Sequence, residues 1–259
     1  MIRRNIELFF LLLGPTCFAQ EIAIHPNAHA HNDYEHARPL KEALENGFLS
    51  VEADVHLRNG TLVVAHNFTT SHSPSFERLY LRPLDSLLRI HNGFVYANEQ
   101  KTFFLMIDIK TEAEATYIAL RKLFDKYQSL NCNAVNCPVK IFLSGERPLS
   151  TMAREGYAGV GIDGRPDDLG KGYASDLMPV ISDTYKNWSG WNGNSAPAGK
   201  DLQRIRELAQ RVHAEGKRLR LWAIPDNEVG WGALLNAGVD LINTDRLQQL
   251  NSFLSHRRL

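Results

Sequence analysis

The sequence predicts an α/β protein, specifically an eight-stranded (β/α)8 TIM barrel. Eight short apolar runs suited to β-strands recur along the chain, and segments with helical periodicity separate most of them. The chain has 259 residues, of which 44% are hydrophobic and 22% are charged. A barrel of this kind commonly needs about 250 residues as one unit. Length and composition therefore fit one barrel with a large core.

The predicted strands are runs of apolar and β-branched residues. They lie at residues 22–30, 48–55, 103–109, 139–143, 159–162, 178–182, 219–224 and 239–243. After the second of these, Asn59 and Gly60 predict a tight turn. Residues 61–66 then form a small hairpin extension, which places His66 near the polar end of the second strand.

Amphipathic segments between the strands predict helices on the outside of the barrel. Residues 201–216 carry one apolar face at helical spacing, made by Leu202, Ile205, Leu208, Ala209 and Val212. Residues 38–47, 113–130 and 231–238 show the same period. Such helices need only one apolar face each, because only one side packs on the barrel.

The N-terminus, residues 1–20, predicts a secretory signal peptide. Arg3 and Arg4 precede an apolar stretch, and small residues follow it. We expect cleavage just after Ala19 or Gln20, which makes the protein exported, either periplasmic or secreted. No apolar run in the sequence reaches the 18 residues of a membrane span, so we expect no transmembrane segment.

Removal of this leader leaves residues 21–259 as a single domain. Cys17 is removed with the leader, and a lipid anchor at this cysteine is the alternative, although the residues before it make a poor lipobox. Cys132 and Cys137 remain, and an even pair in an exported protein predicts a disulfide. Closing so short a loop should stabilise the fold by roughly 2 kcal/mol. A zinc half-site is the rival interpretation, and no nearby cysteine or histidine completes it.

Two acidic residues share one face of the second predicted strand. Glu52 and Asp54 alternate with small apolar residues, so both carboxylates point to the same side of an extended chain. Two acids on one face repel each other unless a cation lies between them. A divalent metal is the simplest such cation, because hard cations take carboxylate oxygens as ligands. A solvated strand face is the alternative.

An acid and a base lie together at the end of the third predicted strand. Asp108 and Lys110 occupy one face, while Ile107 and Ile109 occupy the other. A buried strand is normally apolar on both faces, so this pair needs an explanation, and a surface ion pair is the simplest one. Barrel enzymes keep their sites at the carboxyl ends of their strands, which is where these charges fall.

Five motifs resemble, in order along the chain, those of the phospholipase C-like phosphodiesterases. They are HAHNDYEHARPLKEALENGF, VEADVHLRNGTLVVAH, LMIDIKTE, LRLWAIPDN and GVDLINTDR. This superfamily includes the glycerophosphodiester phosphodiesterases, the bacterial phosphatidylinositol-specific phospholipases C and the spider-venom sphingomyelinase D type enzymes. The HAHNDY opening is most similar to the branch named altered inheritance of mitochondria protein 6. The resemblance implies a TIM barrel of the phospholipase C-like phosphodiesterase type.

The resemblance also implies a role for each of the polar residues above. It implies two catalytic histidines, a phosphate-facing lysine and three metal ligands, which are His31, His66, Lys110, Glu52, Asp54 and Asp108. His29 is the alternative to His31 as the first histidine. Sparse carboxylate ligation favours Mg²⁺, with Ca²⁺ as the alternative, because water and substrate phosphate can fill the remaining positions.

Several positions that are expected to contact the substrate depart from the family pattern or lie outside it. Asn32 stands where the glycerophosphodiesterases have arginine, and Asn67 replaces an aspartate. Trp222 matches a family tryptophan at the end of the seventh strand. The loop after the sixth strand is rich in turn residues yet carries two more tryptophans, which predicts a substrate wall. We therefore expect four residues to bind the substrate, namely Asn32, Trp222, Trp188 and Trp191.

These patterns favour an exported metal-dependent phosphodiesterase that acts on a glycerophosphodiester or phospholipid-like molecule. Two histidines can exchange the required protons, because their pKa lies near neutrality. The nucleophile is either a hydroxyl of the substrate, which gives a cyclic phosphate, or water. The alternative function is a non-catalytic barrel that binds a phosphorylated or sugar ligand. Zero net charge and a pI near 7.2 predict no nucleic-acid partner, and we expect a monomer.

Overall fold

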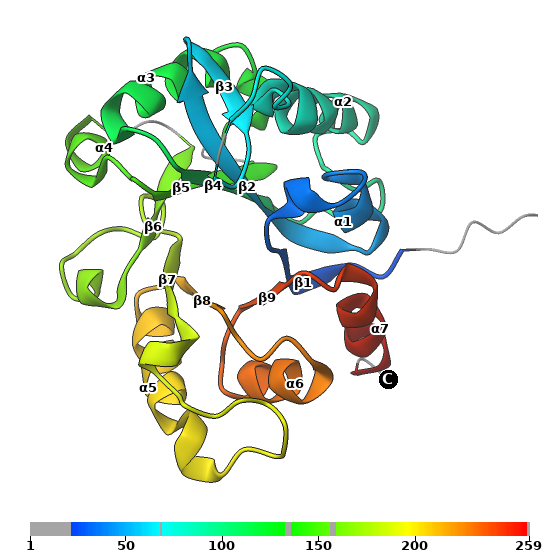
Figure 1. The fold of residues 1–259 in the computed structure, drawn as a ribbon, viewed down its shortest axis with the longest axis vertical. Coiled ribbons are helices and arrows are strands. Elements are labelled where there is room, and N and C mark those ends of the chain that lie inside the picture. Colours follow the sequence, from blue (N-terminus) through cyan, green and yellow to red (C-terminus); the bar gives the residue numbers. More distant parts are fainter. Residues whose placement is uncertain (1–21, 68, 133–135, 156–158, 258–259) are drawn as a thin grey trace, which may run out of the picture.

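Eight parallel strands form a closed barrel in the computed structural model, which describes residues 22–67, 69–132, 136–155 and 159–257. The strands follow one another around the ring in chain order, and the last strand pairs with the first. Figure 1 shows this ring with helices around its outside. The predicted fold class, a (β/α)8 TIM barrel, is therefore confirmed.

Each predicted strand corresponds to one barrel strand. The barrel consists of β1 (His25–Ala30), β2 (Phe48–Arg58), β4 (Phe103–Ile109), β5 (Val139–Gly145), β6 (Val160–Gly164), β7 (Val180–Thr184), β8 (Arg218–Trp222) and β9 (Leu241–Thr244). The strands are buried on both faces, which is why they are visible in the sequence as apolar runs.

The hairpin predicted after the second strand is also present. Strand β3 (Thr61–Val64) pairs antiparallel with β2 and lengthens it beyond its predicted end. Asn59 and Gly60 form the turn with positive φ angles of 48° and 76°, the left-handed conformation that an Asn-Gly turn adopts readily. Figure 1 shows this hairpin extending away from the ring.

Seven α-helices cover the described part of the barrel. They are α1 (Lys41–Glu45), α2 (Arg82–Ile90), α3 (Ala113–Phe124), α4 (Leu149–Glu155), α5 (Gln203–Ala214), α6 (Glu228–Asn236) and α7 (Leu247–Arg257). The predicted helical segments correspond to α1, α3, α5 and α6. Helix α4 spans only 7 residues, which is shorter than the window over which the helical period is recognisable. Between β6 and β7 lies only a short 3-10 helix, η4 (Pro166–Asp168), in a fully described segment.

A small apolar cluster fills the interior of the barrel. Met106, Phe142, Val180 and Leu241 are buried and form a group separate from the main core. They occupy alternate strand positions, whose neighbours Leu105, Ile107, Ile141, Leu143, Ile181 and Ile242 belong to the core under the helices. Asp54 and Asp108 lie two strand positions beyond Met106 toward the carboxyl ends of the strands, so this cluster forms an apolar floor beneath them.

The cysteine pair forms the predicted bond. Cys132 and Cys137 are linked by a disulfide in the segment before β5. Across the described residues, no helix combines the length and apolar character that a membrane crossing requires. The predicted signal peptide and Cys17 lie outside the described residues.

Candidate active site

Strand register brings the three predicted metal ligands together. Asp54 of β2 lies directly opposite Asp108 of the neighbouring parallel strand β4, and Glu52 lies two residues before Asp54 on the same face. Each of the three side chains offers an oxygen, and these oxygens lie within 4.8 Å of one another. The three carboxylates that alternate with apolar residues in the sequence thus converge on one point in the structure.

A cavity of about 410 Å³ opens at this end of the barrel. Its described lining contains seven of the predicted site residues, namely His31, Asn32, Glu52, His66, Asp108, Lys110 and Trp222. Asp54 is fully buried next to Asp108 and is not itself among the described lining residues. The cavity also includes Asp163 and several residues that motif reasoning did not identify, which are Met106, Ser144, Gly145, Arg165, Arg220 and Ala223.

Each acid gives one oxygen to protein donors. Lys110 Nζ lies 2.7 Å from Asp108 Oδ2 and 3.1 Å from Asp54 Oδ2. Arg220 Nη2 donates to Glu52 Oε2 at 2.6 Å. The other oxygens of the two aspartates, Asp54 Oδ1 and Asp108 Oδ1, are buried and have no hydrogen-bond partner. A buried carboxylate oxygen needs a partner, so the three residues fit a divalent cation of the type that prefers oxygen ligands.

The charges in the cavity follow from burial and pairing. Burial alone would raise the pKa of Glu52, but Arg220 and His29 outweigh it, so this pKa lies well below its usual range. Burial raises the pKa of Asp108, and the Lys110 ammonium offsets only part of this. Burial would lower the pKa of Lys110, but Asp108 and Asp54 outweigh it and raise that pKa. Lys110 and Arg220 are therefore fixed cations beside the acids.

The hairpin delivers His66 to the edge of the acid cluster. His66 Nδ1 lies 3.1 Å from Asp54 Oδ2. Tyr34, from the short helix η1 (Asp33–Glu35), donates its hydroxyl to the same oxygen at 2.8 Å and lies 3.2 Å from His66 Nδ1. A carboxylate can only accept, so this contact assigns a proton to His66 Nδ1 and leaves Nε2 available.

His31 is also held by a carboxylate, at the point where β1 and β9 meet. It follows β1, and its backbone N–H donates to the carbonyl of Thr244 at the end of β9. Its Nδ1 lies 2.8 Å from Asp245 Oδ1. Both histidines thus present Nδ1 to a carboxylate and line the cavity with the rest of the ring.

His29, the alternative first histidine, does not line this cavity in the described residues. It is fully buried, with Nδ1 2.7 Å from Ser50 Oγ and Nε2 3.3 Å from Glu52 Oε2. Burial, reinforced by Arg220, lowers the pKa of His29 to about 4. A neutral His29 can donate a hydrogen bond from Nε2 to the Glu52 carboxylate and hold it in position. The geometry therefore places His31, and not His29, at the cavity.

The structure separates the three predicted tryptophans. Trp222 lines the cavity and is 42% exposed. Trp188 and Trp191 are absent from its described lining. Trp188 instead lines a neighbouring cavity of about 440 Å³, which shares Arg165 with this one. Each indole N–H is used close by, with Trp188 donating to Asp183 Oδ2 at 2.8 Å and Trp191 donating to the carbonyl of Ser195 at 3.0 Å. These bonds, which composition does not reveal, hold Trp188 against the end of β7 and Trp191 within its own loop.

Arg220 is a site residue that sequence reasoning missed. It is a charged residue inside the otherwise apolar predicted strand 219–224, which corresponds to β8. That contrast is the same signal that identified Asp108. Asp163 ends the apolar run 159–162, a position that suits either a pocket wall or a cap, and the structure places it in the cavity lining. Gly145 carried no such signal, yet it has a φ of 67°, and a Cβ there would collide with Asp108 Oδ1 and the carbonyl of Ile109.

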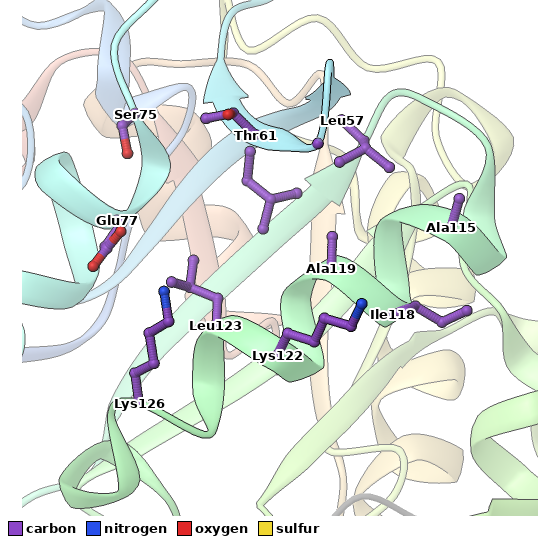
Figure 2. A pocket seen from close by; sticks show the side chains of 12 residues that line it. Leu57, Thr61, Ser75, Glu77, Ala115, Ile118, Ala119, Lys122, Leu123 and Lys126 are labelled. Carbon is purple, nitrogen blue, oxygen red and sulfur yellow. The ribbon is translucent and has the colours of Figure 1, made fainter.

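A further cavity lies away from these residues. It has a volume of about 460 Å³ and lies between the hairpin and α3 (Figure 2). Half of its described lining residues are aliphatic, and Lys122, Lys126 and Glu77 are the charged members. It contains no histidine and a single carboxylate among those residues, so the acid and histidine chemistry belongs to the barrel cavity.

Comparison with known proteins agrees with the resemblance inferred from the motifs. Residues 17–153 match the model of a family described as the AIM6-like phosphodiesterase domain. The protein "Altered inheritance of mitochondria protein 6" of Kluyveromyces lactis is 31% identical, over 90% of this chain and 73% of that protein. Its namesake in Eremothecium gossypii is 26% identical, over 90% and 71%. A homolog in Arthroderma benhamiae is 27% identical, over 84% and 80%.

A solved structure agrees at the level of the fold. The crystal structure of glycerophosphodiester phosphodiesterase from Agrobacterium tumefaciens str. C58 superposes with a TM-score of 0.51 and 13% sequence identity. The match covers 89% of this chain and all of that one. The family model and this fold together support a phosphodiesterase, and the motif-based assignment to the phospholipase C-like superfamily is confirmed.

Proposed function

Because the chain belongs to the family of AIM6-like phosphodiesterase domains, we propose that it is a metal-dependent phosphodiesterase with histidine general acid/base catalysis. Its substrate is a small-molecule or lipid phosphodiester. The convergence of Glu52, Asp54 and Asp108 beside two carboxylate-held histidines, His31 and His66, supports this proposal most strongly.

In this proposal the three acids hold one divalent cation. Mg²⁺ is favoured over Ca²⁺, because three carboxylates leave positions for water and phosphate oxygens. When bound, the cation neutralises charge on the phosphoryl oxygens. Lys110 adds a fixed positive charge for the same phosphate, and Asp108 and Asp54 hold its ammonium in place.

His31 and His66 move the protons. One Nε2 takes the proton of the attacking hydroxyl, and the other, protonated beforehand, gives its proton to the leaving oxygen as the P–O bond breaks. Asp245 and Asp54 hold the two Nδ1 atoms, and each carboxylate stabilises the charged imidazolium beside it. Product analysis identifies the nucleophile, since a substrate hydroxyl yields a cyclic phosphate and water yields a phosphomonoester.

We also propose export, with residues 1–20 as the leader and residues 21–259 as the mature barrel. The charged start, apolar stretch and small residues of this segment support it. N-terminal sequencing of the protein recovered from its host should give a mature terminus just after Ala19 or Gln20. Recovery of the whole protein from the cytosol with Met1 intact would contradict export.

Hydrolysis of bis(p-nitrophenyl) phosphate and of glycerophosphocholine tests the proposed activity. We expect turnover with Mg²⁺ and its loss in EDTA. The surface histidine His256 offers a control, because His256→Ala should retain wild-type turnover while His31→Ala does not. A protein that binds phosphorylated compounds but hydrolyses no diester with any divalent cation would instead be the non-catalytic barrel.

A further inference from the structure

Arg165 is a cation of the cavity that the proposed reaction does not use. It directly follows β6 and lines the 410 Å³ cavity together with Ser144 and Asp163. Strand β6 is two strands away from β4, which carries Asp108. Neighbouring strands lie about 4.8 Å apart, so the base of Arg165 is roughly 10 Å from the strand that bears the acid cluster. This position suits a different part of the substrate from the reacting phosphate.

A buried carboxylate anchors Arg165. Asp163 is fully buried, and Arg165 Nη1 donates to its Oδ2 at 2.8 Å. Ser144 of β5 donates to the same oxygen at 2.8 Å, and Ser182 of β7 donates to Oδ1 at 2.6 Å. Three adjacent strands thus fix one carboxylate, which in turn fixes the orientation of the guanidinium.

One edge of the guanidinium is left available. Nη1 is used by the carboxylate of Asp163 and by the carbonyls of Asp163 and Gly164. Nη2 has only a 3.4 Å contact with Ser144 Oγ, and Nε has no acceptor among the described residues. A guanidinium has five N–H groups, and Nε and Nη2 form one of its two-pronged edges. The side chain is 34% exposed, so this edge can be reached by a ligand.

The space beyond Arg165 can hold more than a phosphate. Arg165 also lines a neighbouring cavity of about 440 Å³, together with Trp188 and Arg211. Two acids, Asp167 and Asp183, belong to that lining, and Trp188 and Asn187 already donate to Asp183. Arg165 therefore lies where a head group would leave the catalytic cavity and enter the adjoining one.

We propose that Arg165 binds a second anionic group, a carboxylate or a phosphate monoester, on the head group of the phosphodiester substrate. The proposal rests on the proposed phosphodiesterase function and specifies its substrate class. The planar edge of an arginine pairs with two oxygens of such a group through parallel hydrogen bonds. Arg165 is accordingly a specificity residue, and Asp163 is its positioning residue.

Matched substrates isolate the second anion. Glycerophosphoserine and glycerophosphoethanolamine differ only by a carboxylate, and glycerophosphoinositol 4-phosphate and glycerophosphoinositol differ only by a phosphate monoester. Wild-type kcat/KM should favour the anionic member of one pair, and the pair that shows the preference identifies the group. Arg165→Met should lower kcat/KM for that member by about tenfold more than for its partner, mainly through KM.

Two further variants control this measurement. Arg89→Met removes an arginine of α2 that is 76% exposed and pairs with Asp85, so it should leave the substrate preference unchanged. Arg165→Lys keeps the charge but loses the two-pronged edge, and it should give an intermediate preference. This second variant carries the test if Arg165→Met does not fold, as judged by circular dichroism.

Equal loss on all four substrates would overturn the proposal, because Arg165 would then act on the reacting phosphate or on the fold. So would the absence of any wild-type preference. Calorimetric binding of the same four compounds in EDTA separates this inference from the proposed function. If no diester is hydrolysed but the anionic member binds more tightly and loses this advantage in Arg165→Met, the activity is refuted and the anion site stands.

Discussion

Asp54 shows how much one side chain contributes to the candidate site. Its Oδ2 lies within hydrogen-bond distance of Tyr34, Lys110 and His66, while its Oδ1 is buried without a partner. One oxygen of this carboxylate is thus held by protein donors and the other is left for a cation. This is why a Glu-x-Asp pair in the sequence can indicate a metal site. The predicted hairpin already placed His66 near this carboxylate, but the Tyr34 hydroxyl was not visible in the sequence, because Tyr34 belongs to a separate element.

Removal of either cavity histidine should reduce catalysis. We expect His31→Ala and His66→Ala each to lower kcat by on the order of a hundredfold or more, because proton transfer to the attacking or leaving oxygen loses its partner. Steady-state assays on a natural diester check this. Wild-type rates in both variants would refute the assignment of these two residues.

Asp33 should make folding stability depend on pH. Burial raises its pKa to about 6, although Leu40 N–H and the Tyr80 hydroxyl donate to it. Because the folded pKa exceeds the unfolded value, the stability that the protonated form provides is full below about pH 4 and is lost as pH rises to about 6. The loss is up to about 3 kcal/mol, at about 1.4 kcal/mol for each pH unit between the two values.

Asp33→Asn removes this titration and keeps an oxygen acceptor. Urea unfolding at pH 4, 5, 6 and 7 should therefore show the variant gaining stability relative to the wild type as pH rises. Subtracting the two curves cancels the contribution of other groups, such as His29, whose lowered pKa acts in the opposite direction. A constant difference across this range would contradict the raised pKa.

At the level of elements, the strands were predictable and the covering helices only in part. Buried parallel strands are visible in the sequence as apolar runs. Asn59 and Gly60 predict the turn of the hairpin that leads to His66. Helix α4 was missed because its 7 residues give few turns from which to read a period. Helices α2 and α7 were also missed, and length does not explain this, since α7 with 11 residues is longer than the predicted α1 and α6. The tryptophan loop contributes no residue to the described lining of the barrel cavity, because hydrogen bonds to Asp183 and to the carbonyl of Ser195 determine where Trp188 and Trp191 point.

The end of β5 should tolerate no side chain. Gly145→Ala should destabilise the protein by about 1–3 kcal/mol and weaken metal binding, because the new Cβ would displace Asp108 Oδ1. Gly170 is a matched control, since it has a φ of 82° and nothing lies within 4 Å of an added Cβ. Gly170→Ala should cost only about 1–2 kcal/mol of backbone strain, with metal affinity unchanged. Calorimetry measures both, and equal metal affinities in the two variants would contradict the role of Gly145.

At the level of the whole molecule, barrel closure assembles the site. Arg220 and Glu52 are 168 positions apart in the chain, yet they form an ion pair because β8, β9, β1 and β2 are successive neighbours around the ring. The sequence predicted that such a ring forms and which face bears the site. It could not predict this pairing, because side-chain register across the closure depends on the assembled barrel.

Metal binding should stabilise the whole fold. A cation that binds only the folded chain adds about 2.7 kcal/mol at a hundredfold excess over its Kd. We expect Mg²⁺ to raise the Tm of the wild type and EDTA to reverse the effect, while Asp54→Asn shows a smaller increase. Asp85→Asn on α2 serves as the control for loss of an acid. A Tm that does not respond to any divalent cation would argue against the acid cluster as a metal site.

The apolar floor of the barrel limits the routes by which substrate and product can reach and leave the site. Met106, Phe142, Val180 and Leu241 fill the barrel interior on the amino-terminal side of Asp54 and Asp108. Substrate and product must then use the same entrance. The product phosphate ester therefore has to dissociate through it before the next diester can bind. Product and substrate therefore exclude each other, and accumulated product should slow the enzyme in a way that more substrate overcomes.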